Sequence, residues 1–298
     1  MGRSLVFRFL VVLAHLAGPA AAAPPPRSSG APEAPVSAEE LIRAVARSQR
    51  RADLAVTASA FDQVEVKTEY GRDGRPKSVR RRRFRYASGE GPGVTRELVE
   101  VDGRPATEAE RREDAEDEAR DRRRRADREA ARRASRPTQV RGSEDDPLVG
   151  PIRLSDLIGR FSYGPVEEVI VEGRRAWAVA FAPRPGLRPV GRLDRALGSL
   201  AGRVIVDATD FQVVSVDARL VAPVKIGGGL ALNVRHATIS YRAQQVADGA
   251  WLPCFVGLRV QGRTALLFRL DTAFRFEFSG YSRATVEVDA VVDPRRGR

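Results

Sequence analysis

Cysteine and histidine are scarce in this sequence, and each scarcity excludes a class of chemistry. The single cysteine, Cys254, excludes an internal disulfide and a cysteine-based metal cluster. The two histidines, His15 and His236, leave almost nothing for a histidine-based metal site. No Gly-x-Ser-x-Gly motif occurs, so a serine hydrolase would lack its usual nucleophile turn. We therefore expect a protein that is not an enzyme and that needs no metal or other cofactor.

The remaining residues of catalytic types fit structural roles. His236 lies in an alternating segment that is typical of a strand, and Cys254 belongs to an apolar series that predicts a buried, unreactive thiol. A second interpretation makes Asp207, Asp210 and Asp217 metal ligands, although the first two fit a turn equally well. The glycines at 227–229 lack the following Lys and Ser or Thr of a phosphate loop, so they fit a tight turn.

The N-terminus has the three parts of a secretory signal. A basic start, an apolar run over residues 9–16 and a small-residue end follow one another. The run is shorter than the roughly 20 apolar residues that span a bilayer, which favours a cleaved signal over a membrane anchor. We expect a signal peptide over residues 1–22 and a Pro-rich linker over residues 23–38. The mature protein is then exported, and in a bacterium with two membranes it is periplasmic.

Lysine is also rare, so arginine supplies almost all of the positive charge. The chain of 298 residues carries 51 basic and 39 acidic side chains, a formal net charge of +12. A basic protein can bind nucleic acid or an anionic lipid surface. Because an exported protein rarely meets nucleic acid, we expect no nucleic-acid partner and a transient contact with an anionic membrane surface.

Two capping boxes predict where helices begin. Ser37 and Glu40 can satisfy one another's backbone amides, and a helix of roughly 15 residues should follow with Leu41 and Val45 on its apolar face. Thr107 and Glu110 repeat the pattern.

The second predicted helix, over residues 107–135, consists almost entirely of arginine, acidic residues and alanine. Opposite charges recur four residues apart and stabilise a solvated helix. Its one apolar stripe is formed by Ala115, Ala119, Ala126 and Ala130. So weak a stripe indicates a mobile insertion or flap at about 104–146, or else a surface for a coiled-coil partner.

Elsewhere the hydrophobic period is two, which predicts strands. Residues 63–70 alternate as a half-buried strand, Gly71 to Arg75 form a turn, and residues 79–87 return as a hairpin strand. The run Arg80-Arg-Arg-Arg83 is either a basic patch or a set of charges that prevents edge-to-edge aggregation. A further strand covers 95–101, a short helix covers 152–161, and a meander follows from strands at 165–171, 175–181, 203–207, 212–221, 230–242, 251–260 and 264–288. The last strand should bend near Ser279-Gly280.

One side of the last strand is rich in phenylalanine. Alternation places its large apolar residues on a common side, and Trp177 and Phe181 share a side of an earlier strand. The candidate ligand-binding residues are Trp177, Phe181, Leu266, Phe268, Leu270, Phe274, Phe276 and Phe278. If this side lines an open cavity, Phe276→Ser should cost no more than about 1 kcal/mol of stability, against several in a packed core.

Two segments carry a resemblance to a known family. Val206-Asp207 with Phe211 and Val213, and later Asp248-Gly249 with Trp251 and Pro253, resemble the "V-D-x-x-x-F-x-V" strand and the "dG-x-W-x-P" turn of the outer-membrane lipoprotein-sorting (LolA/LolB-like) superfamily. The likeness covers roughly residues 39–290. It implies a half-open β-barrel whose concave face takes a lipid, lipoprotein or other apolar ligand.

The sequence thus predicts an α+β fold within residues 39–298. We expect a strongly curved antiparallel sheet of about ten strands, half closed and capped by helices, with the long charged helical insertion. The predicted function is an exported periplasmic carrier or sensor of a lipidic or other apolar ligand. The alternative is a non-enzymatic module for protein interaction and envelope-stress sensing, with a filled core and an envelope protein as its partner.

Overall fold

The structure is a computed structural model that describes residues 37–57, 59–88, 94–134, 160–187, 196, 198–226, 232–246, 249, 251–265 and 267–283. The predicted signal peptide, most of the Pro-rich linker, the glycines at 227–229, residues 152–159 of the expected short helix, and Leu266 lie outside these residues. Within them, no helix has both the length and the apolar character needed to cross a membrane.

Two long helices and twelve strands make up the described fold. The helices are α2 (Ala38–Thr57) and α3 (Glu108–Ala134). The strands are β1 (Ser59–Tyr70), β2 (Pro76–Ser88), β3 (Val94–Val101), β4 (Arg104–Pro105), β5 (Phe161–Val171), β6 (Arg174–Pro183), β7 (Leu200–Asp207), β8 (Val213–Leu220), β9 (Val224–Ile226), β10 (Leu232–Gln245), β11 (Trp251–Thr264) and β12 (Phe268–Arg283).

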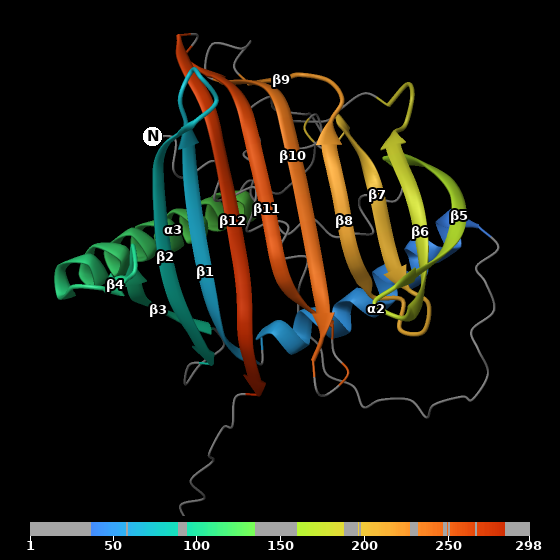
Figure 1. The fold of residues 1–298 in the computed structure, drawn as a ribbon, viewed down its shortest axis with the longest axis horizontal. Helices are drawn as coiled ribbons and strands as arrows, with labels where there is room; N and C mark the ends of the chain where they lie inside the picture. Colours follow the sequence, from blue (N-terminus) through green and yellow to red (C-terminus); the bar gives the residue numbers. More distant parts are fainter. Residues whose placement is uncertain are drawn as a thin grey trace, which may run out of the picture.

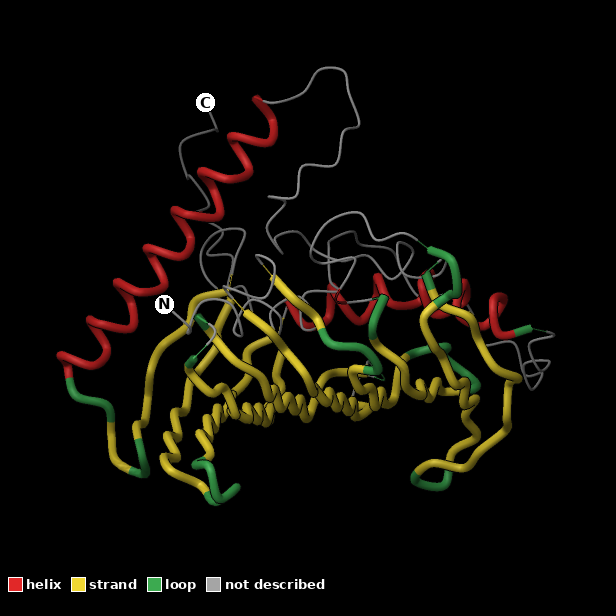
Figure 2. The backbone as a smooth tube through the Cα atoms, turned by 90° about the horizontal axis from the view of Figure 1, so that it is seen from above, coloured by secondary structure: helices red, strands yellow, loops and turns green. Residues whose placement is uncertain are grey.

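All twelve strands belong to one antiparallel sheet (Figure 1). Its order is β4-β3-β2-β1-β12-β11-β10-β8-β7-β6-β5, with β9 pairing on β10. The strands from β5 to β12 form the expected meander, and the N-terminal hairpin continues the sheet because β1 pairs with the last strand, β12. The sheet is curved and remains open, with β4 and β5 at its two ends (Figure 2). It therefore has two more strands than the ten expected.

Both predicted capping boxes form. The Ser37 amide donates to Glu40 Oε2 at 3.2 Å and the Glu40 amide donates to Ser37 Oγ at 3.2 Å, so α2 begins where predicted. At α3 the Thr107 amide donates to Glu110 Oε2 at 2.9 Å and the Glu110 amide donates back to Thr107 Oγ1 at 3.3 Å. The first helix is longer than expected, because it continues through Leu54 to Thr57.

The predicted strands are present with boundaries that shift by a few residues. One assignment was wrong: Phe161 is not the end of a helix but the first residue of β5, where it pairs with Pro183 of β6. The bend expected near Ser279-Gly280 occurs as a β-bulge, since the register between β1 and β12 shifts there and Gly280 adopts a φ of 67°.

Cross-strand register identifies the residues that share one face of the sheet. Paired residues lie on the same side, and a single row of pairs runs from β6 to β3. Its members, in order across the sheet, are Val179, Val204, Val216, Tyr241, Val256, Phe276, Glu65, Arg82 and Val101. We call this side the inner face. The row is apolar up to Phe276 and becomes charged at Glu65 on β1.

Helix α2 packs on the inner face at the β5–β8 end of the sheet (Figure 2). Its buried residues Leu41, Ile42 and Val45 contact a cluster that includes Trp177 and Val206. The apolar face predicted for this helix is thereby confirmed. Helix α3 lies on the same side of the sheet at the opposite end.

The first strand does not bury the side that its alternation suggests. Gln63 and Glu65 are buried, whereas Val64 and Val66 on the other side are only half-buried. The reason is tertiary, because the polar side of β1 belongs to the inner face, where charged residues of β2 and α3 cover it.

Candidate ligand-binding face

Besides a small cluster around Phe84 beneath α3, the inner face carries two apolar clusters, and the larger of these lies across the centre of the sheet. Its buried members come from six strands: Phe161, Leu200, Ala218, Ile239, Val256, Leu258, Val260, Phe274 and Phe276. Half-buried Tyr163, Phe181, Tyr241, Leu270 and Phe278 border it. Over the described ranges every buried member belongs to a strand, whereas the smaller cluster includes residues of α2.

Seven of the eight predicted ligand-binding residues are described, all except Leu266, and they lie on this one face in different surroundings. Phe274 and Phe276 are buried and their rings stack, with centroids 6.4 Å apart. Phe181 lies edge-to-face against Phe161 at 5.2 Å. Trp177 belongs instead to the smaller cluster and is buried beneath α2.

The two ends of the β12 stripe differ in exposure. Leu270 and Phe278 are half-buried at the border of the larger cluster. Phe268 is 67% exposed, at the start of the strand. The stripe therefore runs from the core of the inner face out to solvent.

Burial at Phe276 contradicts the expectation of an open cavity wall. Only 4% of its surface is exposed. A polar substitution there leaves a hole and a buried hydroxyl, as in a packed core. Phe276 is therefore a structural residue of this face, and the half-buried border residues are better placed to contact a ligand.

Sequence reasoning missed an aromatic group on the N-terminal hairpin. Phe61 of β1 stacks on Tyr86 of β2 with ring centroids 4.6 Å apart, and it also meets Phe278 at 6.0 Å and Tyr281 at 5.3 Å. Burial raises the pKa of Tyr86 to about 12, although the neighbouring Arg96 acts in the opposite direction. The missing information was the pairing of β1 with β12, which no local pattern specifies.

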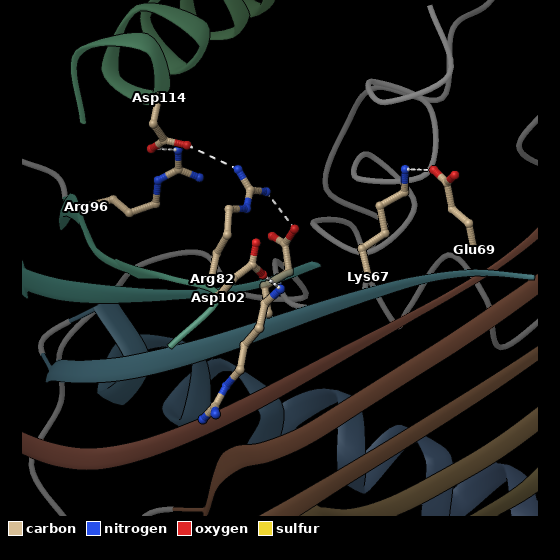
Figure 3. A network of polar contacts seen from close by, with 8 residues as sticks. Lys67, Glu69, Arg82, Arg96, Asp102 and Asp114 are labelled. Carbon is tan, nitrogen blue, oxygen red and sulfur yellow. Dashed lines mark hydrogen bonds and ion pairs between the residues drawn. The ribbon is translucent and has the colours of Figure 1, made fainter. Parts of the chain in front are cut away.

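A polar strip on β1 and β2 adjoins the apolar surface. Gln63, Glu65 and Lys67 lie opposite Phe278, Phe276 and Phe274 in the register of β1 with β12. Lys67 pairs with Glu69 and lies opposite the exposed Arg80 of β2 (Figure 3). Glu65 Oε1 accepts from Arg82 at 2.6 Å, while its buried Oε2 has no hydrogen-bond partner in the structure's described part. The inner face thus combines an apolar surface with a polar border.

Helix α3 docks on this border through a carboxylate. Asp114 accepts from Arg96 at 2.5 Å and from Arg82 at 3.4 Å, so it bridges two arginines of neighbouring strands (Figure 3). The two guanidinium groups lie 4.6 and 5.1 Å from the ring centroid of the buried Phe84. Glu118 adds a contact of 3.2 Å to Arg96 Nε. A largely desolvated ion network therefore attaches the helix to the sheet.

The alanine stripe was the wrong contact face. All four alanines of the stripe are exposed, whereas the half-buried residues of the helix are Glu110, Asp114, Glu118 and Asp121. These four carboxylates recur at helical spacing. The first half of the helix therefore rests on the sheet through acidic residues that meet arginines.

The two segments that carry the family resemblance meet at one end of the sheet. Asp207 is buried and accepts from the amides of Thr209 and Asp210, both at 2.9 Å, which is the turn role anticipated for it. Asp210 Oδ2 in turn accepts from Trp251 Nε1 at 3.2 Å. These residues join the β7–β8 turn to the start of β11.

The same turn holds α2. Ser48 Oγ donates to the Phe211 carbonyl at 2.5 Å, and Gln212 Nε2 donates to the Ser48 carbonyl at 2.7 Å. The motif residues thus have an architectural role, because they hold the helix that covers part of the inner face.

Residues of catalytic types show no catalytic arrangement in the ranges that the structure describes. His236 is exposed on β10, and Asp217 pairs with Arg242 at 2.8 Å. Cys254 is half-buried rather than buried, and burial raises the pKa of its thiol. No group of three or more His, Cys, Asp or Glu side chains that could hold a metal occurs among the described residues.

Comparisons with known proteins were made for sequence and for fold. No protein-family model matches the sequence, and no curated protein matches it. Solved structures do match the fold. An outer membrane lipoprotein-sorting protein domain from Vibrio parahaemolyticus is 10% identical with a TM-score of 0.34, covering 82% of this chain and 92% of that one.

Two further structures are similar. A DUF1329 family protein from Desulfovibrio piger is 11% identical with a TM-score of 0.31, covering 83% of this chain and 93% of that one. The MucA/MucB complex structure from Pseudomonas aeruginosa contains a chain that is 11% identical with a TM-score of 0.23, covering 83% of this chain and 98% of that one. The first match names the same group of proteins that the sequence motifs resemble.

Proposed function

We propose that this protein is a non-enzymatic carrier or sensor that binds a lipidic or other apolar ligand on the inner face of its sheet. The observation that carries the proposal is the half-buried border of the larger cluster, where Tyr163, Phe181, Tyr241, Leu270 and Phe278 leave apolar surface partly accessible on the inner face. An apolar sheet face is stable only against a second apolar layer. An acyl chain supplies such a layer without any specific side chain.

The expected affinity follows from the area of the acyl chain. Burying a methylene group contributes about 0.8 kcal/mol, so ten methylenes contribute roughly 8 kcal/mol before the costs of association. A net value near 8 kcal/mol corresponds to a dissociation constant of about 1 μM. Because association costs at least about 4 kcal/mol, this net value requires about 12 kcal/mol from burial, or about 15 methylenes. We therefore expect chains of about 16 carbons to bind measurably and chains of about ten carbons or fewer to bind weakly.

The polar strip on β1 and β2 gives the ligand an orientation. Lys67 and Arg80 lie opposite one another on the inner face. They form the next inner-face pair after Glu65 and Arg82, two residues further along the strands. An anionic headgroup placed there would meet positive charge while its chain lies along Phe274 and Leu258. We propose that ligands with an anionic head and an apolar tail bind more tightly than neutral ones.

A matched pair of variants on β10 tests the proposal. Ala237 and Thr238 are neighbours on one strand, but Ala237 is half-buried beside the larger cluster whereas Thr238 is exposed on the opposite face. A fluorescent fatty-acyl probe should bind wild type and Thr238→Trp alike. Ala237→Trp should weaken binding at least tenfold, because the indole occupies the apolar surface. Equal binding by the two variants, or no probe binding by wild type, would reject the carrier function.

The second candidate is a protein-interaction module, and the burial of Phe276 and Val256 favours it. Both side chains are less than 5% exposed, as in a filled core. In this case the inner face is structural, and an outer surface or α3 would contact an envelope protein. Wild type would then bind no acyl probe. If α3 is the contact surface, wild type should pull down an envelope protein that the Asp114→Ala variant does not.

We further propose that residues 1–22 are removed on export and that residues 39–298 fold as one unit in the periplasm. The basic, apolar and small-residue parts of the N-terminus support this. N-terminal sequencing of protein from the cell envelope should give a chain that begins at Ala22 or Ala23. A mature chain that still begins at Met1 would contradict the proposal.

A further inference from the structure

The hairpin between β11 and β12 ends in an apolar tip. Leu267 is 85% exposed and Phe268 is 67% exposed. The turn is tight, since the Leu267 amide donates to the Ala265 carbonyl at 2.8 Å and Ala265 has a φ of 46°. Two adjacent large apolar side chains held in solvent are costly unless a partner covers them.

Basic residues surround this tip. Arg263 and Arg269 pair directly behind it in the hairpin register. Arg263 is exposed and makes no ion pair within the described residues. Arg269 Nη1 donates to the Arg72 carbonyl at 3.3 Å, which brings the β1–β2 turn alongside.

That second turn is basic as well. Arg72, Arg75 and Lys77 are exposed there, with Asp73 as the acidic residue between them. The two tips lie together at one end of the sheet, at the top of Figure 1. Apolar residues between arginines match a surface that is anionic outside and apolar beneath.

The apolar tip is continuous with the inner face. Phe268, Leu270 and Phe274 lie on the same side of β12, and their exposure falls in that order from solvent to the larger cluster. The acyl chain of a lipid that leaves the bilayer at the tip would therefore meet apolar side chains along β12.

From these observations we propose that the β11–β12 tip docks on an anionic phospholipid bilayer. Leu267 and Phe268 insert among the acyl chains, and Arg263 and Arg72 contact the lipid phosphates, while Arg269 stays paired with Asp271 at 3.0 Å. A bilayer is favoured over a protein partner because two apolar side chains cannot form the roughly 800 Å² per partner of a stable protein interface. Amphipathic segments that combine apolar and basic residues bind at lipid interfaces, with each basic residue adding attraction to anionic headgroups. The inference extends the proposed function, since docking would present the apolar stripe to lipid.

Vesicle sedimentation tests the docking. The full mature chain should bind vesicles that contain phosphatidylglycerol and should bind pure phosphatidylcholine at least tenfold more weakly. The double variant Leu267→Ser/Phe268→Ser should lose at least tenfold in affinity for the anionic vesicles. Arg263→Gln should lose several-fold and show less dependence on salt.

Ile170→Ser is the matched control. Ile170 is 65% exposed and lies beside the β5–β6 turn, at the other end of the strands and at the far edge of the sheet. This variant should bind vesicles like wild type. In Phe268→Trp, the new indole should shift its emission to the blue when anionic vesicles are added. Because both tip residues are exposed, the urea midpoint of the double variant should equal that of wild type.

Three results would overturn the docking: wild type that ignores anionic vesicles, a double variant that binds as wild type does, or an Ile170→Ser variant that loses binding equally. Self-association that the double variant abolishes, without vesicle binding, would identify the tip as a protein interface instead. The proposed function is tested separately, because monomeric acyl probe added from solution should bind Leu267→Ser as it binds wild type, since Leu267 is not one of the candidate ligand-binding residues. Wild type that binds the probe but not anionic vesicles refutes only the docking, and wild type that binds anionic vesicles but not the probe refutes only the carrier.

Discussion

Replacing Asp114 by alanine should release α3 from the sheet at a large cost in stability. The Asp114 side chain is 11% exposed and its partner Arg96 is 12% exposed, so the pair is largely desolvated. Removing one member of a buried ion pair costs about 3–5 kcal/mol, because the other charge remains buried without compensation. Arg96 keeps its contact with Glu118 and Arg82 keeps Glu65, which places the expected loss near the lower end, at about 3 kcal/mol.

A second effect acts in the same direction. The guanidinium groups of Arg82 and Arg96 both lie within 5.1 Å of the Phe84 ring centroid, and Asp114 is the carboxylate that bridges them. Without the Asp114 carboxylate, the positive charges of Arg82 and Arg96 face each other across a low-dielectric region. The repulsion should loosen the first half of α3 as well as lower the free energy of unfolding.

Asp117→Ala is the matched control, because it makes the same change three residues along the same helix. Asp117 is 55% exposed and pairs with the exposed Arg120, so its loss should cost less than about 1 kcal/mol. Urea unfolding of the two variants measures the difference, and limited trypsin digestion should cut α3 faster in Asp114→Ala alone. Equal stability losses in the two variants would refute the docking of α3 by a buried ion network.

Three further predictions concern single side chains. Phe276→Ser should lower the free energy of unfolding by about 3–5 kcal/mol, and Phe278→Ser, at a half-buried position, by less; equal losses in urea unfolding would contradict this. Because burial raises the pKa of Cys254, Ellman's reagent at pH 8 should label the folded thiol more slowly than the urea-unfolded one, and equal rates would refute the assignment. Arg104, together with the Thr107 amide and hydroxyl, lowers the pKa of Glu110 from 4.5 to about 2. The stabilisation of α3 by ionised Glu110 should therefore be complete above pH 4.5 and disappear as the pH falls through 2. An NMR titration midpoint of Glu110 near 4.5 would contradict this.

Features encoded by nearby residues could be predicted from the sequence. The capping boxes at Ser37 and Thr107 act through side chains three residues away, and both form. The Gly71–Arg75 turn and the bulge at Gly280 follow from local backbone preferences. Alternation along β12 correctly assigned Phe274, Phe276 and Phe278 to one face, because the period of a strand fixes the side of every residue.

Features that depend on distant pairing could not be predicted. Nothing local specifies that β1 pairs with β12, and this pairing places Glu65 on the inner face beside Phe276. The alternation of β1 predicts a half-buried strand, but which of its two sides is buried depends on this pairing. The carboxylate stripe of α3 was overlooked for the same reason, since Asp114 becomes a contact residue only when Arg82 and Arg96 lie beneath it.

The central claim is that the inner face of the sheet holds an acyl ligand, and photo-crosslinking tests it most directly. A fatty acid with a diazirine on its chain is bound to the full mature protein, activated by light and located by fragmentation of the tryptic peptides. On β10, residues alternate between the two faces, with Ile239 and Tyr241 on the inner face and Thr238 and Ser240 on the outer face. The account predicts label on the half-buried inner-face residues, Ala237 and Tyr241 of β10 and Phe278 of β12. Label on Thr238 and Ser240 instead, or no label on any inner-face residue, would contradict it.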